Sequence, residues 1–285
     1  MQPRLTVSAL HKVYESSGRR VEAVRDLTFT VDAGELVCLV GPSGCGKTTL
    51  LKCLGGLLTP TSGEVLLEGR RVTGPPPDMA FVFQEYGRSL FPWMRVGDNV
   101  GLPLRQKPLS KERRRELVAD ALRSVGLEDV SSAYPWQLSG GMQQRAAIAR
   151  ALAHEPRVLL MDEPFAAVDA QTRADLEDLV RRLWRERAMT VVFVTHDIDE
   201  AVYLGERVIV LSASPTVVQE QLKVDLPAER DQLRTRVAPR FAELRTQVYE
   251  QIRTAQRGEP VDRLRKPGSP ASSPGAGSGS GSGLG

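Results

Sequence analysis

The sequence predicts an α/β fold built on a mostly parallel sheet flanked by helices. Short apolar runs that are typical of buried strands alternate with helical patterns along the chain. Several of these runs end directly in polar residues, and ligands in open α/β sheets bind at the carboxyl ends of strands. One run leads into a glycine-rich loop that opens a helix.

Length, composition and charge limit the classes of protein to which the chain can belong. With 285 residues, 41% of them hydrophobic and 26% charged, the chain can fold as one large or two modest globular domains. The net charge of +3 gives no argument for a nucleic-acid partner. The sequence contains no apolar run of membrane-spanning length and no secretory signal at its N-terminus, so we expect a cytosolic protein. The three cysteines, Cys38, Cys45 and Cys53, are interpreted as reduced thiols.

Two alternating patterns precede the glycine-rich loop. Residues 5–14 predict an edge strand, and residues 21–31 predict a second strand after a turn. Tyr14 is either an ordinary strand aromatic or a ring that stacks on a nucleotide base. Residues 35–40 then predict a buried strand that runs into the loop.

The loop fits the phosphate-binding pattern G-x-x-x-x-G-K-[ST]. It comprises Gly41, Pro42, Ser43, Gly44, Cys45, Gly46, Lys47, Thr48 and Thr49. Its glycines let backbone N–H groups point at a polyphosphate, Lys47 can place a cation between the β- and γ-phosphates, and Thr48 can ligate Mg²⁺. A chance match is the alternative, which the flanking strand and helix make less frequent. A thiol in such an anion-binding loop should have a lowered pKa, so we expect alkylation of Cys45 to inactivate the protein.

A second buried strand is predicted at residues 79–83, before Gln84. Gln84 either caps the core or reaches a metal ion. Residues 85–99 mix aromatics with glycines and charges, which indicates a local core or an exposed docking surface. Residues 110–126 predict an amphipathic helix. A helix from about Met142 to His154 follows the turn Ser139-Gly140-Gly141, which is either a plain N-cap or a second anion-binding helix start.

The third buried strand, within residues 156–164, ends in Asp162 and Glu163. Adjacent carboxylates at a strand end are unfavourable if buried without partners, and a metal ion with a nearby water removes that cost. Asp162 would organise the Mg²⁺ shell and Glu163 would polarise the attacking water. Asp169 then lies in a turn before a helix over residues 173–187, and a fourth strand over 189–195 ends in His196. A lone histidine is usually structural, but this one again follows a strand.

The C-terminal part changes in character. After a strand over residues 208–211, residues 231–253 show helical spacing that Pro239 should interrupt. Residues 258–285 are rich in Pro, Gly and Ser and predict disorder, and their last part is similar to an artificial linker.

In this order the motifs resemble the ATP-binding subunit of ABC transporters over about residues 4–225. The stretch that distinguishes this family from other P-loop ATPases is residues 138–145. The resemblance implies a P-loop NTPase core with an antiparallel β subdomain and a helical signature subdomain. It implies a Q-loop at Gln84, the catalytic Glu163, a D-loop acid at Asp169, a switch histidine at His196 and base stacking by Tyr14.

The same resemblance implies ATP and Mg²⁺ as cofactors and a second copy of the chain as partner. Two copies would face head to tail, with each ATP held between the P-loop of one copy and Ser139, Gly140 and Gly141 of the other. Lys47, Glu163 and His196 would be catalytic, and Thr48, Gln84 and Asp162 would hold the metal. Met142 stands where the family has Gln, and Ala166 stands where it has Ser, which removes polar contacts without removing the hydrolytic set.

The implied domains are an ATP-binding domain over 1–225 with a helical subdomain over about 85–155, a helical extension over 226–257 and a tail over 258–285. Transmembrane permease subunits, and indirectly an extracytoplasmic solute-binding protein, are the implied partners at the cytoplasmic face of the membrane, with no nucleic acid. Residues 89–100 and 224–227 resemble the nitrate, sulfonate and taurine importer group. The alternatives are another cargo, export or lipid trafficking, and a non-transport ABC ATPase of DNA maintenance or translation.

Overall fold

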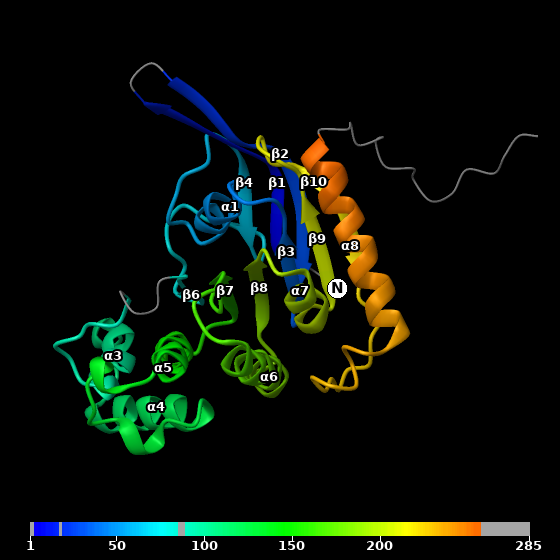
Figure 1. The fold of residues 1–285 in the computed structure, drawn as a ribbon. Coiled ribbons are helices and arrows are strands. Elements are labelled where there is room, and N and C mark those ends of the chain that lie inside the picture. Colours follow the sequence, from blue (N-terminus) through cyan, green and yellow to red (C-terminus); the bar gives the residue numbers. More distant parts are fainter. Residues whose placement is uncertain (1–2, 17–18, 85–88, 258–285) are drawn as a thin grey trace, which may run out of the picture.

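The computed structural model describes residues 3–16, 19–84 and 89–257. In this part of the chain a smaller antiparallel sheet and a set of helices pack around a central, mostly parallel sheet (Figure 1). The strands are β1 Pro3–Ser16, β2 Arg19–Asp32, β3 Leu36–Val40, β4 Ser62–Leu67, β5 Arg70–Arg71, β6 Met79–Val82, β7 Val158–Asp162, β8 Thr190–Thr195, β9 Arg207–Leu211 and β10 Val218–Lys223. The α-helices are α1 Lys47–Leu54, α3 Val96–Val100, α4 Lys111–Ser124, α5 Gly140–Ala153, α6 Ala170–Arg187, α7 Ile198–Leu204 and α8 Pro239–Arg257, and short 3-10 helices cover Leu102–Gln106, Glu128–Val130 and Pro135–Gln137.

The larger sheet has the order β10-β9-β3-β8-β7-β6. Strands β9, β3, β8, β7 and β6 run parallel, and β10 pairs antiparallel at one edge. Because the parallel strands end on the same side, the residues that follow β3, β6, β7 and β8 meet at one edge of the sheet. This sheet and its flanking helices confirm the predicted α/β class.

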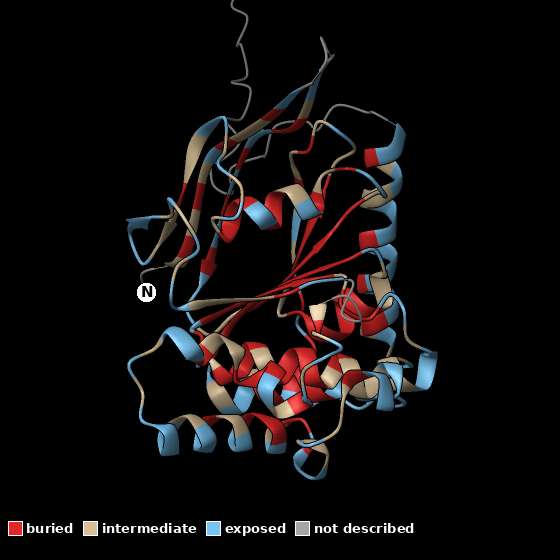
Figure 2. Ribbon diagram, turned by 90° about the vertical axis from the view of Figure 1, so that its left-hand side faces the viewer, coloured by how far each residue is buried: buried red, intermediate tan, exposed pale blue. Residues whose placement is uncertain are grey.

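The central strands are buried on both faces, as Figure 2 shows in red. In β3, Leu36, Cys38 and Val40 belong to the core on one face, while Val37 and Leu39 belong to the core on the other. The first face is covered by α5, α6, α7 and α8, and the second by α1 and the smaller sheet. Burial on both faces explains why these strands are continuous apolar runs in the sequence.

The smaller sheet is antiparallel with the order β2-β1-β4-β5, so it forms the predicted antiparallel β subdomain. The expectation that residues 5–14 form an edge strand is wrong, because β1 pairs with β2 on one side and with β4 on the other. The alternation of apolar residues indicates a strand but carries no information about which partners lie beside it.

Helices α3, α4 and α5 pack on one another in a separate group at the lower left of Figure 1, away from α8. The predicted strand over residues 79–83 is β6, an edge strand that is only partly buried. The two short elements β10 and α7 have no counterpart in the sequence predictions, because their patterns are too short to separate from loops.

The C-terminal helix differs from its prediction at its start. Pro239 does not interrupt α8 but begins it, because proline lacks an N–H that the first turn of a helix leaves unpaired anyway. Leu233 and Val237, two of the apolar residues that give residues 231–253 their helical spacing, precede α8 and are exposed. Phe241, Leu244 and Val248 are buried against the first face of the sheet. The predicted disorder of residues 258–285 lies outside the described residues.

Candidate functional site

The glycine-rich loop links the end of β3 to the start of α1, so it lies at the edge of the sheet where the parallel strands end. Gly46 adopts a φ of 112° immediately before the helix. A side chain at this position would also approach the carbonyl oxygen of Ala23 to 3.0 Å, which adds a steric reason for glycine. The positive end of the α1 dipole therefore faces the space enclosed by residues 41–46, which favours an anion there.

Lys47 reaches back across this loop. Its Nζ donates hydrogen bonds to the carbonyl oxygens of Gly41 at 3.0 Å and Pro42 at 3.1 Å. The same Nζ lies 3.7 Å from Oε1 of Glu163, and the Lys47 side chain is 5% exposed. The ammonium group thus stands between the loop and the carboxylate that follows β7, where it can pair with a phosphate oxygen.

Thr48 and Asp162 form the polar contact next to this lysine. The Thr48 hydroxyl donates to Oδ1 of Asp162 at 3.2 Å. Burial raises the pKa of the Asp162 carboxyl, and the hydrogen bond from Thr48 opposes that rise. A buried carboxylate beside a hydroxyl is a pair of hard oxygen donors, which fits Mg²⁺.

The metal set predicted from the sequence is brought together only in part. The Gln84 Nε2 lies 3.5 Å from Oε2 of Glu163, and its partner in this structure is therefore the carboxylate and not the Thr48–Asp162 pair. Among the described residues, no group of three or more His, Cys, Asp and Glu side chains is arranged to hold a metal. A cation here would draw its remaining ligands from phosphate oxygens and water, as Mg²⁺ usually does.

Glu163 and His196 face each other across the ends of β7 and β8. Nδ1 of His196 lies 2.9 Å from Oε2 of Glu163. Glu163 has a φ of 42°, a left-handed conformation that turns the chain sharply at the end of β7. The Glu163 side chain is 18% exposed and the His196 side chain 57% exposed, so solvent reaches this pair. A carboxylate held this way can accept a proton from water.

Tyr14 lies near the other end of the loop. Its hydroxyl is 3.2 Å from the Thr49 hydroxyl, and its ring is 41% exposed with the Lys12 Nζ 5.4 Å from its centroid. An exposed ring beside the first turn of α1 is available for stacking on a base.

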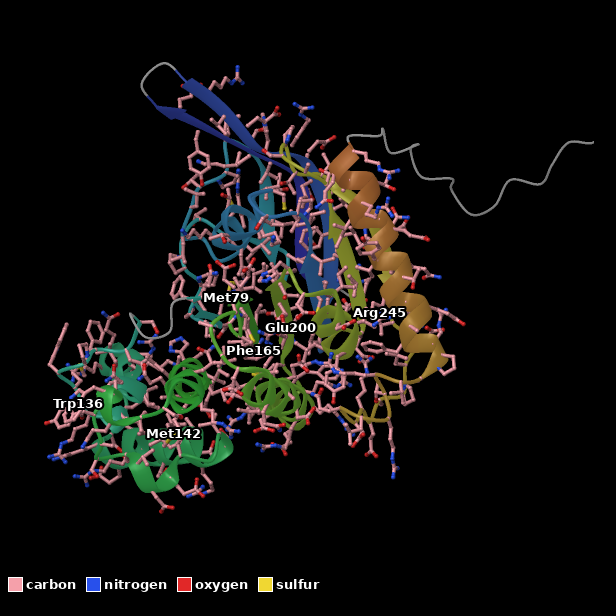
Figure 3. The ribbon with its side chains drawn as sticks, in the orientation of Figure 1. Met79, Trp136, Met142, Phe165, Glu200 and Arg245 are labelled. Atoms are coloured by element: carbon pink, nitrogen blue, oxygen red, sulfur yellow. The ribbon has the colours of Figure 1, made fainter. Side chains whose placement is uncertain are left out.

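The Ser139-Gly140-Gly141 turn lies elsewhere, at the start of α5 in the helical group; Figure 3 labels Met142 there. The Ser139 Oγ accepts a hydrogen bond from the Met142 N–H at 3.3 Å, so Ser139 caps α5. No hydrogen bond among the described residues connects this turn to residues 41–49. Asp169 caps α6 by accepting from the Thr172 N–H at 2.9 Å and the Thr172 hydroxyl at 2.7 Å, and these bonds lower the pKa of its carboxyl.

The expectation of a low pKa at Cys45 is wrong. The thiol packs in the apolar core between α1 and the sheet, where Cys45 is 2% exposed. This burial raises the pKa of the Cys45 thiol, and the nearby Lys47 only opposes the rise. The loop pattern predicts that the Cys45 backbone faces an anion. It carries no information about the side chain, which points into the apolar core instead.

Sequence reasoning missed the charged residues behind Glu163 and His196. Arg173, in the first turn of α6, donates to Oδ2 of Asp197 at 3.2 Å, and Glu200 in α7 is 4% exposed. These side chains share a cavity of about 20 Å³ with Glu163 and His196. The only sequence signal was the acidic stretch that follows His196, which is typical of any helix start.

Comparisons with known proteins agree with this geometry. The sequence model of the family described as "ABC transporter" matches residues 24–166. The chain is 44% identical to a nitrate import ATP-binding protein of Synechocystis sp., over 80% of this chain and 85% of that one. It is 40% identical to an aliphatic sulfonates import ATP-binding protein of Bacillus licheniformis, over 88% of this chain and 95% of that one.

Solved structures agree as well. A dimeric ATP-binding cassette in a post-hydrolysis state, bound to ADP and phosphate, superimposes with a TM-score of 0.69 at 34% identity, covering 78% of this chain and 100% of that chain. A subunit of an ABC transporter complex from Clostridium perfringens superimposes with a TM-score of 0.70 at 27% identity, covering 79% and 90%. Both the overall fold and the sequence of this chain are therefore similar to those of ATP-binding cassettes.

Proposed function

The chain belongs to the ABC transporter ATP-binding proteins, and we propose that residues 41–49, Asp162, Glu163 and His196 form the site at which it hydrolyses ATP to drive import of a small solute. The main support is the meeting of five side chains from distant parts of the sequence where β3, β7 and β8 end. They are Lys47, Thr48, Asp162, Glu163 and His196. These side chains supply the cation, the hard oxygen donors and the base that phosphoryl transfer requires.

In the proposed reaction Glu163 accepts a proton from the water that attacks the γ-phosphate. Lys47 moves from the carbonyl oxygens of Gly41 and Pro42 to the phosphate oxygens and stabilises their charge. His196 orients the Glu163 carboxylate and stabilises negative charge on the γ-phosphate. Mg²⁺ held by Thr48 and Asp162, with Gln84 nearby, would neutralise charge on the β- and γ-phosphates. Tyr14 stacks on the base.

We propose that a second copy of the chain completes each site. Support comes from the position of the Ser139-Gly140-Gly141 turn on the helical group, where none of the hydrogen bonds among the described residues joins it to residues 41–49 of its own chain. In a head-to-tail dimer this turn and Asp169 would reach the ATP of the partner. The dimeric cassette with ADP and phosphate, which is similar to this chain, supports this arrangement.

None of the described helices is both long and apolar enough to cross a bilayer. We propose that the chain binds transmembrane permease subunits at the cytoplasmic face of the membrane, and through them serves a solute-binding protein outside. The names of the nitrate and sulfonate import relatives favour a small oxyanion such as nitrate, a sulfonate or taurine as cargo.

A pull-down from native membranes tests this proposal. The bait is the full-length chain with Glu163→Gln, in the presence of ATP, because a stalled site should keep the assembly together. Recovery of a multispanning permease supports the transport function. The unsubstituted chain without ATP is the control, and it should retain less of the permease. Recovery of DNA or ribosomes, or of no membrane protein, would contradict the transport function. It would not contradict the ATPase reaction, which is tested separately by measuring ATP hydrolysis by the purified chain. The solute-binding protein that accompanies the permease can then be tested with nitrate and sulfonates.

A further inference from the structure

Helix α7 directly follows His196, and three arginines from the segment after β10 contact it. Arg230 lies at its C-terminal end. The Arg230 Nη1 donates to the carbonyl oxygens of Val202 at 3.1 Å, Tyr203 at 2.6 Å and Gly205 at 3.0 Å. The Arg230 side chain is 0% exposed, so this contact is a buried charge on the negative end of the helix.

Arg236 contacts α7 at Tyr203, in the last turn of the helix. Its Nη2 lies 2.5 Å from Oε2 of Glu177, its Nε donates to Oε1 of Gln232 at 2.9 Å, and its guanidinium lies 4.9 Å from the centroid of the Tyr203 ring. Glu177 belongs to α6 and is 1% exposed. Arg236 therefore joins α6 to α7 from the side of the C-terminal segment.

Arg245 lies at the N-terminal end of α7. Its Nε is 3.8 Å from Oδ1 of Asp199, and both side chains are about half exposed. Figure 3 labels Arg245 on α8 and Glu200 on the neighbouring α7. An exposed pair at this distance contributes little to stability, so Arg236 and Arg230 carry most of the contact.

Arg236 also provides charge to an acidic cluster in which Glu177 and Glu200 are buried and Asp197 is partly exposed. The cluster comprises Glu177 from α6, Asp197 from the loop after β8, and Glu200 from α7, with Arg173 of α6 paired to Asp197 at 3.2 Å. Burial raises the pKa of the Glu177 and Glu200 carboxyls, and the charge of Arg236 opposes the rise at Glu177. The buried thiol of Cys38 in β3 also faces Glu200, whose charge helps to raise the pKa of that thiol.

The acidic cluster lies directly behind the reacting pair. A cavity of about 20 Å³ is lined by Glu163 and His196 together with Arg173, Asp197 and Glu200. Asp197 also accepts a hydrogen bond from the Glu200 N–H at 3.1 Å and so caps α7. A shift of α7 or of the Asp197 carboxylate therefore moves the residue next to it in the chain, His196.

We propose that Arg236 is a positioning residue for ATP hydrolysis, holding α7 against α6 so that His196 stays within reach of Glu163. The C-terminal segment is then part of the hydrolytic unit and not a separate appendage. This inference rests on the proposed function, because it assigns a role to Arg236 in the reaction of that same site.

The test compares three full-length variants. Arg236→Ala removes the contact, Arg236→Lys keeps the charge but not the planar group that bridges Glu177, Gln232 and Tyr203, and Arg240→Ala is the control. Arg240 lies nearby at the start of α8 and pairs with Asp225 and Glu243, neither of which belongs to α7. For each variant kcat, KM for ATP, the pH dependence of kcat and thermal unfolding are measured.

We expect Arg236→Ala to lower kcat about tenfold with KM for ATP changed less than about twofold, because a displaced group acts in the transition state more than in binding. The acidic limb of the kcat profile should move to higher pH, since loss of a cation raises the pKa of the neighbouring acids. Arg236→Lys should recover part of both effects, and Arg240→Ala should match the unsubstituted chain.

A folded Arg236→Ala with unchanged kcat and an unchanged acidic limb would overturn the inference. If that variant does not fold, Arg236→Lys decides: a normal unfolding temperature with unchanged kcat and pH profile also overturns it. Failure of the proposed function gives a different result. In that case the unsubstituted chain would not hydrolyse ATP, or would hydrolyse it at the same rate as Glu163→Gln.

Discussion

Nδ1 of His196 lies 2.9 Å from Oε2 of Glu163, so one contact joins the end of β8 to the end of β7. Lys47 approaches the other carboxylate oxygen, Oε1, at 3.7 Å. Each oxygen of Glu163 is therefore oriented by a different neighbour, one from the glycine-rich loop and one from the loop before α7. The carboxylate has a fixed direction without being fully buried, which suits a group that must accept a proton from water.

Replacing Glu163 with glutamine tests its role as the base. The amide keeps the size of the side chain but does not accept the proton, so we expect kcat to fall by about 100- to 1,000-fold with ATP binding retained. The stalled protein should elute as a closed dimer on a sizing column in the presence of ATP. Glu186→Gln, at an exposed position of α6, is the control. Turnover at the unsubstituted rate in Glu163→Gln would rule out Glu163 as the base.

Removal of divalent cations tests the Thr48–Asp162 pair. We expect a chelator to abolish hydrolysis and added Mg²⁺ to restore it, because the site offers only hard oxygen donors. Asp162→Asn should raise the Mg²⁺ concentration needed for half-maximal activity at least about tenfold, since it removes a charged ligand. The measurement is ATPase activity against free Mg²⁺. An identical Mg²⁺ dependence in this variant would mean that Asp162 does not hold the metal.

A close contact between Gly141 and Thr172 predicts that a substitution at Gly141 can be compensated by a second substitution at Thr172. A Cβ at this position would lie 2.5 Å from Cγ2 of Thr172, so Gly141→Ala should displace the start of α5 from α6. The strain corresponds to roughly 1–3 kcal/mol, and we expect most of the ATPase activity to be lost. Thr172→Ser removes only that methyl group and keeps the hydroxyl that bonds to Asp169.

The double variant Gly141→Ala with Thr172→Ser should therefore regain activity, and Thr172→Ser alone should be near normal. The readouts are ATPase rate and thermal unfolding. No recovery in the double variant would show that Gly141 is needed for contacts outside its own chain and not for its fit against Thr172.

The buried cysteines should resist modification. Cys38, Cys45 and Cys53 are at most 2% exposed, and burial raises the pKa of all three thiols. Because the thiolate is the reactive form, we expect alkylation of the folded protein to be slow and alkylation in denaturant to be complete, as measured by intact mass. Fast labelling of Cys45 that ATP prevents would contradict this prediction and favour the reactive thiol of low pKa that the loop pattern suggested.

The pH dependence of stability should depend on Glu200. Burial raises the pKa of its carboxyl from 4.5 to about 8. The folded state therefore binds this proton more tightly, so its stabilisation is complete below about pH 4.5 and is lost as the pH rises through 8. We expect Glu200→Gln to be more stable than the unsubstituted chain by roughly 1–3 kcal/mol at pH 8, and by less at pH 5.

The measurement is urea unfolding at several pH values, with Glu186→Gln as the control at an exposed position. Parallel stability curves for Glu200→Gln and the unsubstituted chain would contradict the prediction.

The parts of the site that the sequence predicts are those whose chemistry is local. The loop over 41–49, the acids at the end of β7 and the histidine after β8 each stand at the end of their own strand, so a short pattern suffices to find them. Arg236 and Glu177 are different, because their 2.5 Å contact depends on how the C-terminal segment returns to α6. No spacing in the sequence encodes that return.

The fold shows the same division. The positions of the central strands followed from apolar patterns, whereas the position of β10 did not, and the pairing of β1 on both sides depends on the tertiary arrangement of β2 and β4. The direction of the Cys45 side chain and the start of α8 at Pro239 were also misjudged, because each depends on packing or on the geometry of a helix terminus.

The position of α8 has a consequence for how the protein is made. Phe241, Leu244 and Val248 complete the core beside α7 and β9, yet they are synthesised after every strand of both sheets. A nascent chain on the ribosome therefore holds the P-loop and the catalytic pair before the arginines that hold α7 have emerged. The last described helix to leave the ribosome therefore completes the core on which α7 packs, so a chain that terminates before α8 would carry its nucleotide loop without a stably packed α7.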